Sequence, residues 1–231
     1  MNKIKLDSRL SSVASLVRDG SVVADIGTDH AYLLCYLIQN GISPRGIAAD
    51  IGKGPLENAK KTVTDFELCN EVKLILSDGL RSLPDNCADD IVIAGMGGIL
   101  ISEILSAVDW IKNKNIRIIA QPMTHAETLR KFLVTNGFEI FEEKTATDGK
   151  RFYCTVAASY SGKADKKDVS YYYLGELLKN RDEITKDYLD KMLRSMEKKL
   201  SALKKAKPEE STELQELITE IKKKISEAYY D

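Results

Sequence analysis

Aspartates and glycines recur in this 231-residue chain at points where a short apolar run ends. Carboxylates accept hydrogen bonds from hydroxyl, amino and ammonium groups, and glycine lets the backbone approach a ligand closely. Such positions suit a site for a polar ligand that carries positive charge. The residues at or just after these run ends are Gly27, Asp29, His30, Asp50, Ile51, Asp78, Gly79, Gly95, Met96, Gly97 and Gly98.

Alternating strand and helix patterns must position these residues. Buried parallel strands are predicted by the short apolar runs at 22–26, 46–49, 72–76, 91–94 and 116–120. Helices are predicted at 6–17, 31–39, 55–63, 99–108 and 126–135. Two further runs flank a turn at Asp148-Gly149 and predict a closing antiparallel pair at 138–143 and 152–158. We therefore predict a doubly wound α/β sheet.

The carboxyl ends of parallel strands decide which ligand this sheet suits, because ligands of open α/β sheets bind there. An acid at the second strand end, here Asp50, commonly holds ribose hydroxyls. A dinucleotide site needs glycine where this chain has Asp29, because the backbone must approach a pyrophosphate. S-adenosylmethionine has no phosphate and carries two cationic groups against one carboxylate, so acids at three strand ends favour it over NAD or FAD.

The last part of the chain has a heptad pattern instead. Apolar residues alternate in steps of four and three at 189, 193, 196, 200 and 203, and again, after Pro208, at 214, 218, 221, 225 and 228. This spacing predicts two helices that fold back as an antiparallel coiled-coil hairpin. Residues 161–167 are polar and suit a linker. We therefore predict a cofactor-binding sheet domain at 1–160 and a helical domain at 161–231.

The composition excludes several protein classes. Lys and Arg number 34 against 35 Asp and Glu, so the formal net charge is −1 and the chain as a whole is not basic. Its apolar runs are shorter than the roughly 18 to 20 residues of a membrane helix, and its first residues lack a signal-peptide core. We expect a cytoplasmic protein without membrane contact. The four scattered cysteines and two histidines indicate free buried thiols, with no metal site and no disulfide.

Five motifs are specific to one family. DIGTDHAYL, LSDGL, IAGMGG, AQPM and the later YYLGELL resemble the bacterial tRNA (adenine-22-N1)-methyltransferase family, known as TrmK. The resemblance covers essentially the whole chain, including the opening helix and the helical hairpin. It implies a class I methyltransferase fold of Rossmann-like type, S-adenosyl-L-methionine as cofactor, and tRNA as substrate.

The resemblance also implies roles for the residues at the strand ends. Gly27, Asp29 and His30 would line the methionine end of the cofactor, and Asp50 would hold its ribose. The remaining cofactor contacts would come from Ile51, Asp78, Gly79, Gly95 and Met96, with Asp78 and Gly79 at the adenine. Gly97 and Gly98 would contact the substrate at the mouth where the target base enters.

The residues agree with methylation at a ring nitrogen. Enzymes that methylate the exocyclic adenine amine resemble one another in an Asp/Asn-Pro-Pro-aromatic loop after the fourth strand, and this chain has Gly95-Met96-Gly97-Gly98 there. Ring N1 offers an in-plane lone pair, so alignment with the methyl group supplies much of the acceleration. The product is cationic, and a carboxylate would stabilise the developing charge or accept a proton. Asp29 is the candidate catalytic residue, ahead of Asp78.

A lysine cluster near the expected hairpin tip is a candidate tRNA phosphate site. Its members are Lys198, Lys199, Lys204, Lys205 and Lys207. An ordinary solvated surface explains the same cluster equally well. Further basic residues could add charge around the catalytic face: Arg9, Arg45, Lys53, Arg81, Lys150 and Arg151. Two rival functions stay open at this point: a methyltransferase that acts on another RNA base or on a small molecule, and a non-catalytic RNA-binding or scaffold protein. The oligomeric state is open as well.

Overall fold

The computed structural model describes residues 3–206 and 208–230. Its strands are β1 (Val23–Ile26), β2 (Gly46–Asp50), β3 (Val72–Leu76), β4 (Asp90–Gly97), β5 (Arg117–Thr124), β6 (Phe138–Thr147) and β7 (Phe152–Tyr160). Its helices are α1 (Ser8–Ala14), α2 (Tyr32–Gln39), α3 (Lys53–Asp65), α4 (Gly98–Ser106), α5 (Ala126–Thr135), α6 (Val169–Leu174), the 3-10 helix η1 (Leu177–Lys179), α7 (Glu183–Ala206) and α8 (Pro208–Tyr230). The predicted succession of strands and helices is confirmed.

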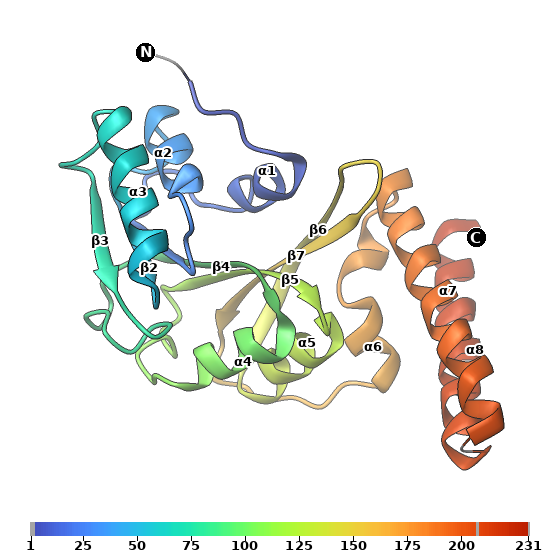
Figure 1. Ribbon diagram of the computed structural model, residues 1–231. Coiled ribbons are helices and arrows are strands. Elements are labelled where there is room, and N and C mark those ends of the chain that lie inside the picture. The colour runs from blue at the N-terminus through green and yellow to red at the C-terminus, as the bar shows by residue number, and fades with distance from the viewer. Residues whose placement is uncertain (1–2, 207, 231) are drawn as a thin grey trace.

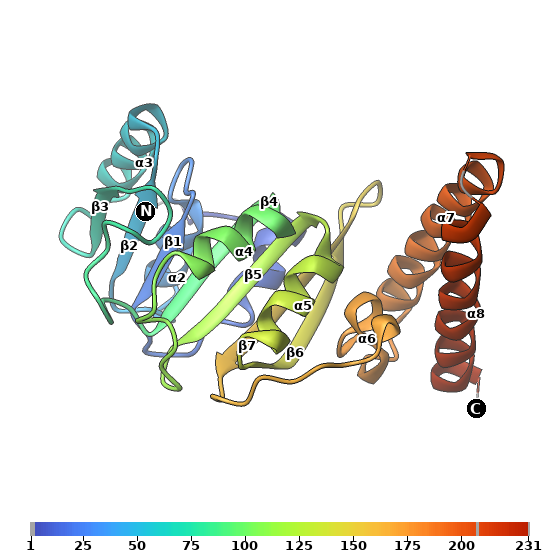
Figure 2. The same ribbon diagram turned by 90° about the horizontal axis from the view of Figure 1, so that it is seen from below.

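The strands form one seven-stranded sheet in the order β3-β2-β1-β4-β5-β7-β6. β1 to β5 are parallel, and β7 pairs antiparallel with both β5 and β6. Helices cover both faces, with α1 to α3 on one side and α4 and α5 on the other (Figures 1 and 2). β1 pairs with both β2 and β4, so strand order reverses there. Ligands of such sheets bind beyond the carboxyl ends of the strands at this point.

Each face of the sheet has its own apolar core. Ile91 and Ile93 of β4 belong to the cluster beneath α4 and α5, whereas Val92 between them belongs to the cluster beneath α2. Successive side chains of a strand point to opposite faces, so a strand covered on both sides needs an unbroken apolar run. This explains why the central strands were recognisable from the sequence.

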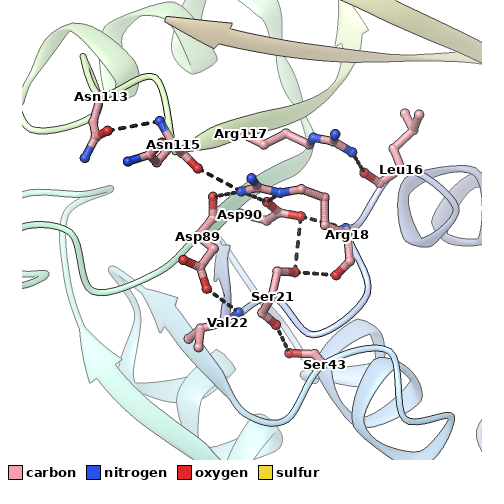
Figure 3. Close-up of polar contacts among 10 residues, drawn as sticks. All are labelled: Leu16, Arg18, Ser21, Val22, Ser43, Asp89, Asp90, Asn113, Asn115 and Arg117. Carbon is pink, nitrogen blue, oxygen red and sulfur yellow. Dashed lines mark hydrogen bonds and ion pairs between the residues drawn. The ribbon is translucent and has the colours of Figure 1, made fainter.

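Arg18, in the segment after α1, joins the amino ends of the central strands (Figure 3). Its Nε donates to Oδ1 of the fully buried Asp90 at 2.7 Å, and its Nη2 donates to the carbonyls of Asp89 at 2.6 Å and Asn115 at 3.0 Å. Asp90 also accepts from the Ser21 hydroxyl at 3.3 Å. This network fixes β1, β4 and β5 at the edge opposite the one where ligands bind.

α7 and α8 form the predicted antiparallel hairpin, which extends from the β6 side of the sheet (Figures 1 and 2). The buried residues of its seam are Leu189, Leu193, Met196, Leu200, Ile218, Ile221 and Ile225. α6 connects the hairpin to the sheet, since Tyr172 is buried and its carbonyl accepts from Arg130 of α5 at 3.0 Å. Residues shortly after 160 thus pack on the sheet. The boundary between a sheet domain and a helical domain at residue 160 stays a prediction.

Two expectations were wrong in detail. The stretch Gly95–Gly98 was expected to be a loop, but β4 continues through Gly97, and Met96 and Gly97 pair with Pro122 and Thr124 of β5. All four cysteines are free, but Cys69 is exposed and Cys87 is only partly buried. Within the described ranges, no helix has both the length and the apolar character needed to cross a membrane.

Candidate active site at the carboxyl edge of the sheet

Large apolar side chains stay exposed along the carboxyl edge of the parallel strands. They are Tyr32, Ile51, Leu76, Ile99, Leu100 and Met123, each at a strand end or in the first turn of the helix that follows. An exposed apolar surface beside polar groups is typical of a ligand or partner site. The candidate aspartates and glycines lie at the same edge, so this edge offers both kinds of contact.

The turn from β1 to α2 packs tightly against the end of β4. Gly27 has φ +77°, and a Cβ added there would lie only 1.9 Å from Cε of Met96, so no other residue fits without displacing that side chain. Thr28 Oγ1 accepts the N–H of Ala31 at 3.0 Å, and Ala31 has a left-handed φ of 53°. Strained backbone of this kind clusters at functional sites. The structure thus brings Gly27 and Met96 into contact.

A buried carboxylate that the sequence reasoning did not select, Asp25, lies at the base of this turn. Its burial raises its pKa from 3.8 to about 6, against opposing effects of Thr28 and Arg9, and the neighbouring Asp50 raises the pKa further. Two carboxylates close enough to repel each other attract a cationic group. A perturbed acid in this position is also typical of a functional site.

Arg9 of α1 contacts the same edge of the sheet at the ends of β4 and β5. Its Nη1 donates to Oε1 of the buried Gln121 at 3.1 Å, and that oxygen also accepts the N–H of Gly95 at 3.2 Å. A Cβ added at Gly95 would lie 3.4 Å from the same Nη1 atom. A guanidinium is therefore held between the ends of β4 and β5, within electrostatic reach of Asp25.

Asp29 and His30 form the exposed part of the β1–α2 turn. Oδ2 of Asp29 lies 3.3 Å from Nε2 of His30, and the Asp29 side chain is 67% exposed. Asn58 of α3 donates to the other carboxylate oxygen at 3.4 Å, and the His30 ring stacks on Tyr32 with centroids 5.1 Å apart. The Asp29 carboxylate is therefore oriented by two side chains while most of its surface faces solvent.

The end of β2 presents a carboxylate and an apolar side chain together. Oδ1 of Asp50 accepts the N–H of Gly52 at 2.6 Å, which fixes the carboxylate at the strand end. Ile51 beside it is 71% exposed. This pair suits a nucleoside, because carboxylate oxygens accept from ribose hydroxyls and an apolar side chain can lie against the face of a base.

The end of β3 places Asp78 and Gly79 next to α4. Asp78 forms an ion pair with Arg81, and both side chains are more than half exposed. Gly79 has φ +59°, and a Cβ added there would lie 2.9 Å from Ile104 of α4. Asp78 is thus available at the surface, while Gly79 has a conformational and a packing reason to be glycine.

The last two glycines of the IAGMGG motif allow β4 and α4 to approach the β5–α5 turn. A Cβ at Gly97 would lie 3.2 Å from Oγ1 of Thr124, and one at Gly98 would lie 2.2 Å from the carbonyl oxygen of His125. Close packing therefore explains both glycines. Their contact with substrate stays a prediction.

The lysine cluster is partly described. The side chains of Lys198, Lys199 and Lys204 are exposed on α7, and Nζ of Lys204 lies 3.4 Å from Oε1 of Gln215. The Lys205 side chain and the whole of Lys207 lie outside the described residues. Phosphate binding by this cluster stays a prediction.

The donor set fits S-adenosylmethionine. In the described part of the chain, no three His, Cys, Asp or Glu side chains are grouped to hold a metal. The carboxylates of Asp25, Asp29 and Asp50 instead lie at or just beyond the ends of two adjacent strands, with a guanidinium nearby. Cationic, hydroxyl and carboxylate groups of one ligand can all find partners there.

The sequence reasoning missed two residues of this edge, Asp25 and Gln121, and it expected Arg9 only to add charge around the catalytic face. Asp25 had a signal, since it is a charged residue inside an apolar strand run, directly before the glycine turn. Gln121 belongs to the quoted AQPM stretch but has no distinctive spacing. Nothing in the sequence connects Arg9 to residues more than 80 positions later, because their contact depends on the fold.

Comparison with known proteins gives a consistent result. A family described as a methyltransferase domain matches residues 6–156. The tRNA (adenine(22)-N(1))-methyltransferase of Bacillus subtilis (strain 168) is 39% identical over 173 residues, which cover 74% of this chain and 70% of that protein.

Two solved structures extend the similarity to the helical hairpin. The B. subtilis m1A22 tRNA methyltransferase TrmK is 28% identical, covers 98% of this chain and 99% of its own, and superposes with a TM-score of 0.82. M. capricolum TrmK in complex with S-adenosyl-homocysteine is 29% identical, covers 96% of this chain and 98% of its own, and gives a TM-score of 0.80. The chain belongs to the bacterial tRNA (adenine(22)-N(1))-methyltransferase family.

Proposed function

We propose that this protein transfers a methyl group from S-adenosyl-L-methionine to N1 of adenine 22 in tRNA. The observation that carries the proposal is the similarity to M. capricolum TrmK bound to S-adenosyl-homocysteine, because it covers 96% of this chain. It therefore includes both the strand edge and the hairpin. We also propose a cytoplasmic location, because the substrate is tRNA.

The cofactor would be held along the ends of β1 to β3. Asp50 would accept hydrogen bonds from the ribose hydroxyls of the cofactor. Ile51 would lie against its adenine, and Asp78 would accept from the adenine amino group. Asp25 and Asp29 would attract its cationic groups, and Arg9 would pair with its carboxylate. Two observations support these roles. The carboxylate of Asp25 is buried and its pKa is raised, and Arg9 donates a hydrogen bond to Gln121 at the same edge of the sheet.

The target adenine would enter over the end of β4, beside the β5–α5 turn. When bound, the cofactor would supply a methyl group on a positively charged sulfur. Ring N1 would accept this methyl group through its in-plane lone pair, S-adenosyl-homocysteine would leave, and the positive charge would pass to the adenine ring. Asp29, oriented by His30 and Asn58, stabilises that charge or accepts a proton from the exocyclic amine.

The hairpin would hold the tRNA by its phosphates. Exposed lysines on α7 provide positive charge that the chain as a whole lacks, since its net charge is −1. A scaffold without catalysis would have no use for the oriented acids at the strand edge, which favours the enzyme over that alternative.

Methyl transfer from labelled cofactor to an unmodified tRNA transcript tests this proposal. We expect incorporation of label into a transcript with adenine at position 22 and none into a transcript with guanine there. Equal incorporation into both would show that another base is the target. Tight tRNA binding with no incorporation into either would favour the non-catalytic alternative.

A further inference from the structure

A cavity of about 450 Å³ lies between the sheet and the hairpin. Its walls include the β5–α5 turn at 122–127, Phe152 at the start of β7, Tyr173 of α6, and one face of α7 between residues 188 and 199. Arg130, Cys154 and Leu214 complete the lining. Volumes of this size are typical of small-ligand sites. The hairpin thus supplies one side of the cavity.

The cavity borders the candidate active site. Thr124, which lines it, pairs with Gly97 at the end of β4, and the carbonyl of His125 packs against Gly98. The β5–α5 turn is thus a shared wall between the two spaces. A nucleotide adjacent to one bound at the end of β4 would reach this cavity.

The walls have the chemistry of a base-binding pocket. Phe152 and Tyr173 are aromatic, and Met123, Met192 and Met196 add flexible sulfur-containing side chains. Unpaired RNA bases stack on aromatic side chains, and methionine adapts to surfaces of varied shape. The pocket therefore suits a flat, uncharged ring.

The rim of the cavity carries positive charge. Lys191 lies over the Phe152 ring with Nζ 5.2 Å from its centroid, and Lys199 is exposed and forms no ion pair within residues 3–206 and 208–230. The acid of the lining, Glu127, lies 3.2 Å from Nδ1 of His125. Two lysines beside an apolar pocket match the phosphate and the base of one nucleotide.

The geometry points to a second nucleotide subsite, which holds one unpaired tRNA nucleotide next to the methylated adenine. Its base lies between Tyr173, Phe152 and the methionines, and its phosphate lies at Lys191 and Lys199. This inference rests on the proposed function, since it takes the end of β4 as the place of the target base.

Two tryptophan variants test the subsite. Ser195 is exposed on α7 and lines the cavity, so Ser195→Trp fills it. Ser201 is exposed on the same helix and does not line it, so Ser201→Trp is the matched control. Ser195→Trp should raise KM for tRNA about 5- to 100-fold, the effect of one lost base stack, with cofactor affinity and Tm equal to those of the control. Equal KM values for the two variants would overturn the subsite.

Abasic tRNAs identify the occupant. An abasic site at one of the two nucleotides that flank the target should weaken binding to the wild type and leave binding to Ser195→Trp unchanged. Binding is measured without cofactor, so this experiment tests the subsite independently of catalysis. A wild type that binds tRNA but methylates nothing would overturn the proposed function and not the subsite.

A second variant tests the subsite if Ser195→Trp does not fold. Lys191→Gln should lower the salt slope of tRNA binding by about one, compared with Lys222→Gln on α8. The inference is contradicted if neither abasic site weakens tRNA binding to the wild type, or if Lys191→Gln leaves the salt slope unchanged.

Discussion

The junction between the sheet and the hairpin depends on Arg130, and Arg130→Met should break it. Nε of Arg130 donates to Oε1 of Glu143 at 2.8 Å, and Nη1 donates to the carbonyls of Tyr172 and Tyr173 at 3.0 and 2.9 Å. The two charged side chains are 1% and 0% exposed. Burial acts to lower the pKa of Arg130, but the attraction of Glu143 raises it overall, so the guanidinium stays charged.

Arg130→Met should lower the free energy of unfolding because it leaves the buried carboxylate of Glu143 without its partner. Removing one partner of a buried ion pair costs about 3 to 5 kcal/mol, because the other charge stays buried without compensation. For a protein of this size, that loss lowers Tm by roughly 6 to 20 °C. Glu143 also accepts the N–H of Glu176 at 2.6 Å, so the damage reaches the segment that leads into α7. The double variant Arg130→Met/Glu143→Gln should recover part of the loss, because no buried charge remains.

Urea unfolding followed by circular dichroism measures both effects. Arg18→Met is the matched control, since it removes a guanidinium at the opposite edge of the sheet, where its partner Asp90 is also buried. At a temperature where all variants are folded, Arg130→Met should weaken tRNA binding more than Arg18→Met does, with cofactor affinity unchanged in Arg130→Met. A loss below about 1 kcal/mol, or a double variant no more stable than the single one, would refute this reasoning.

Four further predictions concern the candidate site. Asp50→Ala should weaken S-adenosylmethionine binding by about 1 to 3 kcal/mol in calorimetry, through lost hydrogen bonds to ribose. Asp29→Asn should lower the single-turnover methylation rate more than cofactor affinity; equal losses would make Asp29 a cofactor ligand only. Because burial raises the pKa of Asp25 to about 6, the stability that its protonated form contributes is present below pH 3.8 and is lost as the pH rises towards 6. The affinity for S-adenosylmethionine should show the opposite trend and weaken as the pH falls through 6, since a neutral Asp25 no longer attracts the positively charged groups of the cofactor. Asp25→Asn should remove both pH dependences. Glu substitutions at Lys198, Lys199 and Lys204 should weaken tRNA binding and flatten its salt dependence while cofactor affinity stays the same; unchanged values would make this face of α7 an ordinary solvated surface.

Regular elements were predictable from local patterns. The bounds of β3 and α5 agree with the sequence-based ranges, since strand and helix periodicity are local properties of the chain. The extension of β4 through Gly97 was not predictable, because glycine weakens a strand and this stretch is held by pairing with Pro122 and Thr124.

The candidate site shows the same contrast. Asp29 and Asp50 could be selected because each follows an apolar run directly. Arg9 could be named only as one of several basic residues around the catalytic face, since its place near Asp25 depends on how α1 packs over the strand ends. The ion pair of Arg130 and Glu143 and the cavity beside the hairpin were likewise hidden, because each joins segments that meet only in the folded chain.

Nucleoside mass spectrometry is the most direct test of the central claim. Unmodified tRNA is incubated with the protein and S-adenosylmethionine labelled in its methyl group, digested to nucleosides, and the modified position is located by sequencing. We expect the label in 1-methyladenosine at position 22, in amounts that fall with Asp29→Asn and Asp50→Ala. Label in another nucleoside, at another position, or in no nucleoside at all would contradict the account.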